Sequence, residues 1–184
     1  MKIQTTTQTL TVSAILIALS TVLSFFKIEM PLGGGLSLLS MLPIALLCCM
    51  LDIKWAFLAS FVYGLIQTAI SFAEVFSWGL SPVALIATYL VDYILAYTVL
   101  GFSGIFKKKG YIGILAGIAL AVFLRFVCHF FTGALIFDIW CEWESAWLYS
   151  VCYNGAYMLP ELILTTAVAA AILKFRQIKE LVIR

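Results

Sequence analysis

The stretch YIGILAGIALAVFLRFVCHFFTGALIF, residues 111–137, decides the fold class of this chain. It contains 27 residues, and the basic side chains within it are Arg125 and His129. About 20 consecutive apolar residues are enough to cross a bilayer as an α-helix. This stretch therefore predicts a membrane-spanning helix, long enough to tilt or to project from the bilayer.

The composition of the whole chain agrees with a membrane protein. Of the 184 residues, 64% are hydrophobic and 11% are charged, whereas soluble domains contain about 25% charged residues. A soluble domain of this length could not bury so much apolar surface, which excludes a soluble enzyme and a disordered chain. The net charge of +2 offers no basic surface for nucleic acid, so we expect no nucleic-acid partner.

Hydropathy predicts an all-α integral membrane protein with six transmembrane helices in a single domain, residues 1–184. The first apolar run has full span length and is followed by others, so we expect it to be retained rather than cleaved as a signal peptide. The second span is short, and we expect irregular structure there, shielded by protein. The six spans are residues 9–27, 37–51, 54–73, 80–104, 111–137 and 147–174.

The basic residues predict the orientation in the membrane. With the N-terminus in the cytoplasm, nine of the eleven Lys and Arg residues fall inside, and both termini are cytoplasmic. This asymmetry either mirrors the positive-inside rule alone or also gives an acidic outer mouth that attracts a cationic solute. The outer loops then carry five of the nine acidic residues, namely Glu29, Glu74, Asp138, Glu142 and Glu144.

Four ionisable side chains lie within the expected spans: Asp92, Arg125, His129 and Glu161. Such groups cost free energy in lipid, so each marks a candidate functional site. At 1.5 Å per residue, the first three and Asn154 fall in the outer half of the bilayer or at its midplane. We expect these four side chains to line one cavity that opens to the outside.

Helical spacing places several polar and aromatic side chains on shared faces. Arg125 and His129 are four residues apart, and Tyr149, Tyr153 and Tyr157 follow each other at the same interval. Aromatic faces attract cations and stack on rings, while a carboxylate and an amide can hydrogen-bond a ring amine. The cavity would therefore suit an aromatic, partly cationic organic solute.

Structural explanations for these residues stay open. Asp92 and Arg125 could form a buried ion pair between the fourth and fifth helices, with Arg125 as the support that keeps Asp92 ionised. His129 could be a hydrogen bonder between helices, and the tyrosines could simply pack. Glu161 follows Pro160, and a structural role at a helix kink is favoured there over a contact with a ligand.

No motif predicts an enzyme, a metal site or a cofactor. The sequence contains no Walker A, HExxH or GxSxG pattern, and one His without a carboxylate pair argues against metal binding. An intramembrane enzyme that uses Asp92 and His129 as acid and base is the unfavoured alternative, and a purely structural subunit is another. A chain without its own energy source must bind passively or depend on a separate motor.

Four motifs give the chain a resemblance to a known family, over about residues 8–175. In their order and spacing they resemble the thiamine-specific substrate-binding subunit, or S-component, of energy-coupling-factor transporters, the ThiT/YuaJ family. The motifs are PLGGG…SMLPI at 31–44, LVDYILAY…GFSGIF at 90–106, RFVCHFFTG at 125–133 and WLYSVCYNG at 147–155.

The resemblance implies a six-helix receptor with an S-component-like fold in the plasma membrane of a prokaryote. It would bind thiamine from outside without a cofactor. A transmembrane coupling subunit and two cytoplasmic ATPase subunits would be its partners. An S-component for another small vitamin or for a thiamine precursor is the nearest alternative.

The resemblance also implies which residues bind the ligand. Asp92 matches the family's acidic residue that bonds the aminopyrimidine, and His129 matches the site histidine. The other matching positions are Tyr93, Tyr149 and Asn154, with Phe137 or Trp140 as the stacking aromatic and Tyr63 at an aromatic position of the third helix.

Two further features take their expected roles from the same resemblance. Gly33, Gly34 and Gly35 would let the first outer loop move as a gate, although some members carry a Trp where this chain has Gly34. Ala14 and Ala18 form a small-xxx-small pair that would dock on the coupling subunit. Ordinary packing of membrane helices is the alternative explanation for the pair.

Overall fold

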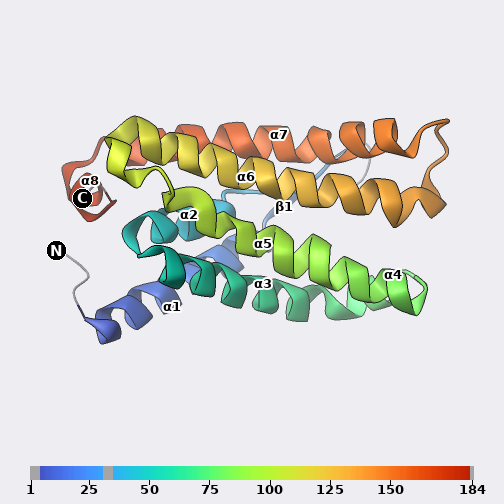
Figure 1. Ribbon diagram of the computed structural model, residues 1–184, viewed down its shortest axis with the longest axis horizontal. Coiled ribbons are helices and arrows are strands. Elements are labelled where there is room, and N and C mark those ends of the chain that lie inside the picture. The colour runs from blue at the N-terminus through green and yellow to red at the C-terminus, as the bar shows by residue number, and fades with distance from the viewer. Residues whose placement is uncertain (1–4, 31–34, 183–184) are drawn as a thin grey trace.

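Helices make up most of the computed structural model, which describes residues 5–30 and 35–182 (Figure 1). Between α3 and α6 the chain forms one continuous helical run that includes a π-helical segment, η1, and a 3-10 segment, η2. The α-helices are α1 (Thr6–Ser24), α2 (Met41–Met50), α3 (Ile53–Phe76), α4 (Pro82–Ala87), α5 (Ala96–Thr98), α6 (Gly110–Leu135), α7 (Ala146–Ile172) and α8 (Arg176–Val182). The remaining elements are η1 (Thr88–Leu95), η2 (Val99–Gly104), two more 3-10 segments, η3 (Lys107–Lys109) and η4 (Phe137–Trp140), and the strands β1 (Lys27–Glu29) and β2 (Gly35–Ser37).

Four apolar helical stretches of the described chain are long enough to cross a membrane: Thr6–Ser24, Ile53–Phe76, Pro82–Leu135 and Ala146–Ile172. The third has 54 residues and reverses direction around η3, so it makes two passes (Figure 1). The predicted all-α membrane fold is confirmed, and these passes correspond to five of the six predicted spans.

The second predicted span, 37–51, is short in the structure as well, and its helix does not have the length of a full transmembrane pass. Its helical part, α2, contains 10 residues and rises only about 15 Å, half of the hydrocarbon thickness. Nine of those residues are buried, so protein rather than lipid surrounds this half-length helix. The preceding residues pair in a short antiparallel hairpin, in which Lys27 lies opposite Ser37 and Glu29 opposite Gly35.

Local sequence explains where several helices begin. Thr5 and Gln8 form a reciprocal capping box at the start of α1, which satisfies backbone N–H groups that have no partner within the helix. The Ser81 hydroxyl caps α4, and Pro82 takes the first helical position, where its missing N–H costs nothing. The Ser145 side chain accepts from the N–H of Leu148 and starts α7.

The core forms around α2, which contacts α1, α3, η2 and α7. Two glycines allow the helix backbones to approach closely: a Cβ at Gly104 would collide with the carbonyl of Cys48, and one at Gly117 with the carbonyl of Ser103. Close backbone approach through small residues is the usual way in which membrane helices pack. These contacts hold η2 between α2 and α6, while α6 and α7 lie side by side (Figure 1).

The start of α1 and the helix α8 lie at the same end of the bundle (Figure 1). This end also carries basic residues, in η3 and near the ends of other helices. By the positive-inside rule, it is therefore the cytoplasmic end. The short helix α8 was not predicted; its Val182 is buried against the core that surrounds α2. The basic residues at this end include Lys54, Lys107, Lys108, Lys109 and Lys174.

Candidate functional site

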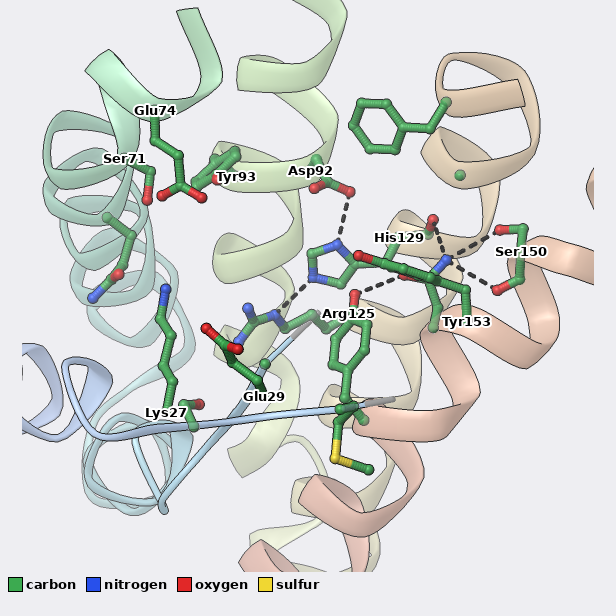
Figure 2. A pocket seen from close by; sticks show the side chains of 18 of the residues that line it. Lys27, Glu29, Ser71, Glu74, Asp92, Tyr93, Arg125, His129, Ser150 and Tyr153 are labelled. Carbon is green, nitrogen blue, oxygen red and sulfur yellow. Dashed lines mark hydrogen bonds and ion pairs between the residues drawn. The ribbon is translucent and has the colours of Figure 1, made fainter. Parts of the chain in front are cut away.

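A cavity of about 780 Å³ lies between the hairpin, α3, η1, α6 and α7. Figure 2 shows its lining from close by. The cavity extends to Trp78, Phe137 and Trp140, at the end of the bundle opposite the termini. These three rings form a cluster with centroid distances of 5.7 to 6.2 Å. An aromatic cluster therefore borders the cavity at its outer end.

Most of the predicted binding residues meet in this cavity, although the spans that carry them are far apart in the sequence. Gly35 also lines it, whereas Gly33 and Gly34 lie outside the described residues. The predicted residues in the lining are Asp92, Tyr93, Arg125, His129, Phe137, Trp140, Tyr149 and Asn154.

Tyr63 is a predicted binding residue that does not line the cavity. Its side chain is fully buried, and its ring packs edge-on against Tyr97, with centroids 5.0 Å apart. Its hydroxyl donates to the backbone carbonyl of Ser20 at 3.4 Å. Tyr97 takes the place at the cavity wall, so Tyr63 supports the wall from behind. Within an apolar stretch, the sequence does not indicate whether Tyr63 or Tyr97 faces the cavity.

Asp92 and Tyr93 both line the cavity from η1, which is π-helical (Figure 2). Consecutive residues of an α-helix diverge by about 100°, and the wider π-helix reduces this angle. The backbone also fits closely here, since a Cβ at Gly64 of α3 would lie 3.2 Å from the carbonyl oxygen of Ile94. Single π-helical turns are frequent at functional sites.

The carboxylate of Asp92 bonds to α6 through His129, not through Arg125. His129 Nδ1 lies 2.7 Å from Asp92 Oδ1, and the Thr132 hydroxyl donates to the same oxygen. The Nε of Arg125 donates to His129 Nε2 at 3.1 Å. The predicted direct ion pair between Asp92 and Arg125 is therefore wrong: the described side chains form a chain in which the imidazole lies between the two charges.

Asn154 ties α7 to α6 at the cavity wall. Its Nδ2 donates to the carbonyl of His129 at 3.1 Å and to the carbonyl of Ser150 at 3.0 Å. Its Oδ1 accepts from the hydroxyl of Tyr157 at 2.6 Å. Gly133 makes room for this contact, because a Cβ there would lie 2.8 Å from Asn154 Nδ2. The amide is thus fixed before any ligand arrives.

The tyrosine stripe of α7 faces the cavity. Tyr149, Tyr153 and Tyr157 all line it, and their successive ring centroids are 5.6 and 6.0 Å apart. Trp143 packs on the outermost of them at 5.5 Å. The wall formed by α7 is therefore a ladder of electron-rich rings, which suits a flat or cationic ligand.

The opposite wall contains residues that sequence reasoning missed as cavity residues. Gln67, Ser71 and Glu74 follow one face of α3, while Lys27 and Glu29 come from β1 (Figure 2). The spacing of four and three residues puts Gln67 and Ser71 on the same face of α3 as Glu74. Glu29 and Glu74 were expected at the acidic outer mouth, and the structure places both in the cavity lining.

The charged side chains of the lining sum to a net negative charge. Glu29, Glu74 and Asp92 are acidic and Lys27 and Arg125 are basic, so three negative and two positive charges leave −1 with a neutral His129. A cavity of this charge complements a monovalent organic cation. The described residues contain no cluster of three or more groups that could hold a metal ion.

Glu161 is buried below the cavity and is not part of its lining. The hydroxyl of Ser37 in β2 donates to its Oε2 at 3.2 Å, and Ser37 also bonds Ser40 at 2.6 Å. The glutamate follows Pro160, inside α7. It therefore attaches the hairpin to α7, in agreement with the structural role favoured from the sequence.

Residues 10–181 match the sequence profile of the family described as thiamine transporter protein (Thia_YuaJ). This match covers nearly the whole chain. The chain belongs to this family.

Two relatives of the thiamine transporter family show how far the similarity extends. The thiamine transporter ThiT of Bacillus subtilis (strain 168) is 30% identical over 162 residues, which cover 80% of this chain and 79% of that protein. A solved structure of ThiT from Listeria monocytogenes superposes with a TM-score of 0.73 at 24% identity, covering 93% of this chain and 96% of that one. The fold of this thiamine transporter family member is therefore shared along almost its full length.

Membership of the thiamine transporter family also places the chain. With several helices long enough to span a bilayer, it is a multi-pass protein of the bacterial plasma membrane. The cytoplasmic end carries the basic residues, so the cavity, which extends to the opposite end, faces the outside.

Proposed function

We propose that this chain is a thiamine-binding S-component. It takes thiamine from outside the cell and passes it to an ATP-driven coupling module. The observation that carries the proposal is the outward cavity in which an oriented carboxylate, Asp92, faces a ladder of tyrosine rings. Membership of the thiamine transporter family supports the same ligand.

The chemistry of thiamine matches the two kinds of group in the cavity. The aminopyrimidine offers an amino group, which Asp92 can accept, while His129 holds Asp92 in place. The Oδ1 of Asn154 has a second lone pair beside the one that accepts from Tyr157, so it can accept a further hydrogen bond from the ligand. The thiazolium ring carries the positive charge, which the faces of Tyr149 and Tyr153 can hold. The net charge of −1 in the lining balances that cation.

The energy for transport comes from other subunits in this proposal, because the sequence contains no Walker A motif. Ala14 and Ala18 lie four residues apart on α1, and both are exposed on the surface of the helix bundle. Small residues allow a second helix to approach closely. This pair is therefore the proposed contact with the transmembrane coupling subunit, which would carry two cytoplasmic ATPase subunits.

The direct test is a titration of the purified protein with thiamine, followed by tryptophan fluorescence. Trp78 and Trp140 line the cavity, so we expect saturable quenching at micromolar thiamine. Trp140→Phe should reduce the signal, whereas Trp55→Phe, a variant at the cytoplasmic start of α3, should leave it unchanged. A wild-type protein that shows no saturable quenching would contradict the proposal.

A ligand panel separates thiamine from related solutes. The free aminopyrimidine alcohol and the free hydroxyethylthiazole each carry half of the recognised groups, so each should bind more weakly than thiamine. Mass spectrometry of ligand that co-purifies with the protein gives an independent answer. Tighter binding of another vitamin or of a precursor would replace thiamine as the substrate.

A further inference from the structure

Asp92 lies at the end of a hydrogen-bond chain that extends past the residues proposed to touch thiamine. Its Oδ1 accepts from His129 Nδ1 at 2.7 Å and from the Thr132 hydroxyl. An oxygen of a carboxylate has about two acceptor positions, so these contacts occupy Oδ1. The other oxygen, Oδ2, accepts no hydrogen bond from any described residue and is the one available to a ligand.

Thr132 has a choice of acceptors, and the carboxylate is the strongest of them. Its hydroxyl also lies 3.2 Å from the carbonyl of Cys128 and 3.0 Å from that of His129. A hydroxyl has a single proton, and an ionised acceptor gives a hydrogen bond about twice as strong as a neutral one. The proton therefore goes to Asp92 rather than to either carbonyl.

Arg125 determines the tautomer of His129. A guanidinium is always protonated and can only donate, so the 3.1 Å contact from Arg125 Nε requires a lone pair on His129 Nε2. The ring proton of the neutral imidazole is then on Nδ1, where it points at Asp92 (Figure 2). The opposite tautomer would place two N–H groups against each other and remove the hydrogen bond from the imidazole to Asp92.

The guanidinium of Arg125 is buried and lies over an aromatic ring. Arg125 is 9% exposed, and its Cζ lies 4.0 Å from the centroid of the Tyr97 ring. Arg125, His129 and Thr132 follow each other at intervals of four and three residues on α6, so they form one stripe that faces η1. A rigid helix therefore presents a prearranged pair of donors to Asp92.

We propose that Arg125 and Thr132 are positioning residues of the thiamine site, which act through His129 and Asp92 to present Oδ2 as a pure acceptor. The identity of the ligand rests on the proposed function, but the hydrogen-bond chain itself does not. A fixed acceptor selects a ligand that has a donor at this position. Thiamine has an amino group there, and its 4-oxo analogue, oxythiamine, has a carbonyl oxygen.

The first test measures selectivity rather than affinity. Thr132→Val removes the hydroxyl and keeps the shape of the side chain. The ratio of the Kd of oxythiamine to the Kd of thiamine should fall about tenfold, the effect of one hydrogen bond to a charged group. Thr68→Val is the matched control, because the Thr68 hydroxyl bonds only to Gly64 of its own helix. A general loss of structure would weaken both ligands alike, so an unchanged ratio in Thr132→Val would overturn the proposal.

The second test reads the tautomer directly and needs no ligand. The chain contains one histidine, so selective ¹⁵N labelling of histidine reports on His129 alone. The wild-type spectrum should show Nδ1 protonated and Nε2 bare, and Arg125→Met should add the Nε2-protonated form. Arg125→Lys restores a donor and should restore the wild-type form.

The two tests fail separately. A wild-type protein that does not bind thiamine but shows the Nδ1-protonated ring would overturn the proposed function and support the hydrogen-bond chain. A protein that binds thiamine but has Nε2 protonated would overturn the chain and leave the function intact. If Arg125→Met does not fold, the proposal is still tested by the wild-type spectrum and by the ratio of the two Kd values in Thr132→Val.

Discussion

The two long walls of the cavity differ in how their polar side chains are held. On the wall of η1, α6 and α7, Asp92, His129 and Asn154 are hydrogen-bonded to protein groups before any ligand is present. On the wall of α3 and the hairpin, Gln67 donates to the Ser24 hydroxyl at 3.0 Å. The charged side chains of this wall, Lys27, Glu29 and Glu74, make no hydrogen bond or ion pair to another described residue.

This difference indicates a division of labour between recognition and attraction. A preorganised polar group can discriminate between ligands, because its geometry is set in advance. An exposed, unpaired charge is screened by solvent and mainly contributes long-range attraction. Substitutions on the first wall should therefore have large effects on affinity that do not depend on salt, and those on the second wall small effects that do.

Asp92→Asn tests the first wall most severely. The variant replaces a charged acceptor with a neutral amide and leaves His129 and Thr132 with a weaker partner. Hydrogen bonds to charged groups contribute about 1.5–3 kcal/mol, so the Kd for thiamine should rise well over tenfold. A titration with fluorescence detection measures this change. Asp52→Asn, at the cytoplasmic start of α3 and with no capping bond, is the control. An unchanged affinity would remove Asp92 from the site.

Gly133→Ala tests whether the contact between α6 and α7 must be this close. The added Cβ would meet the Ser150 hydroxyl and lie 2.8 Å from Asn154 Nδ2, which should push Asn154 away from α6. Overpacking of this kind costs about 1–3 kcal/mol, so both thermal stability and affinity should fall. Gly155→Ala is the matched control on α7, because its Cβ would meet nothing within 4 Å. Equal melting temperatures for Gly133→Ala and Gly155→Ala would contradict this prediction and show that the contact between α6 and α7 can adjust to the added methyl group.

The positions that were predicted from sequence are those where polarity contradicts the membrane. Asp92, His129 and Asn154 stood out because lipid penalises such groups, and their positions along each helix put them in the outer half of the bilayer or at its midplane. Helix rise and length were enough for this, since each span is a nearly straight rod of known pitch. In the structure, all three side chains line the same cavity.

Features that depend on the packing of neighbours were beyond prediction. The short length of the second span and its shielding by protein were expected, but the burial of nine of the ten residues of α2 is known only from the structure. The π-helical segment at Asp92 packs closely against α3 at Gly64, and no residue pattern in the sequence indicates it. The hydrogen-bond partner of Arg125 depends on the distance between facing helices. The spacing of residues along one helix does not define this distance.

Glu74→Gln tests the wall that is formed by α3 and the hairpin. The variant removes one of the three negative charges of the lining while keeping the shape of the side chain. Because Glu74 is exposed, screening limits its effect on a cationic ligand to about two- to fivefold in Kd at low salt. The effect should shrink at high salt. Glu144→Gln, in the loop before α7 and outside the cavity lining, is the control. A large loss that persists at high salt would mean that Glu74 contacts the ligand directly and that the two walls are alike.

Lys27→Gln should have the smallest effect, and it should have the opposite sign. Lys27 brings a positive charge into the lining, and its removal changes the net charge from −1 to −2. A cation should then bind more tightly, by about twofold at low salt, because two charges in bulk water interact by only about 1 kcal/mol at 4 Å. Lys54→Gln, at the cytoplasmic end, should not change the affinity. Weaker binding in Lys27→Gln would instead show that the lysine donates a hydrogen bond to the ligand, so that the hairpin wall takes part in recognition as well as attraction.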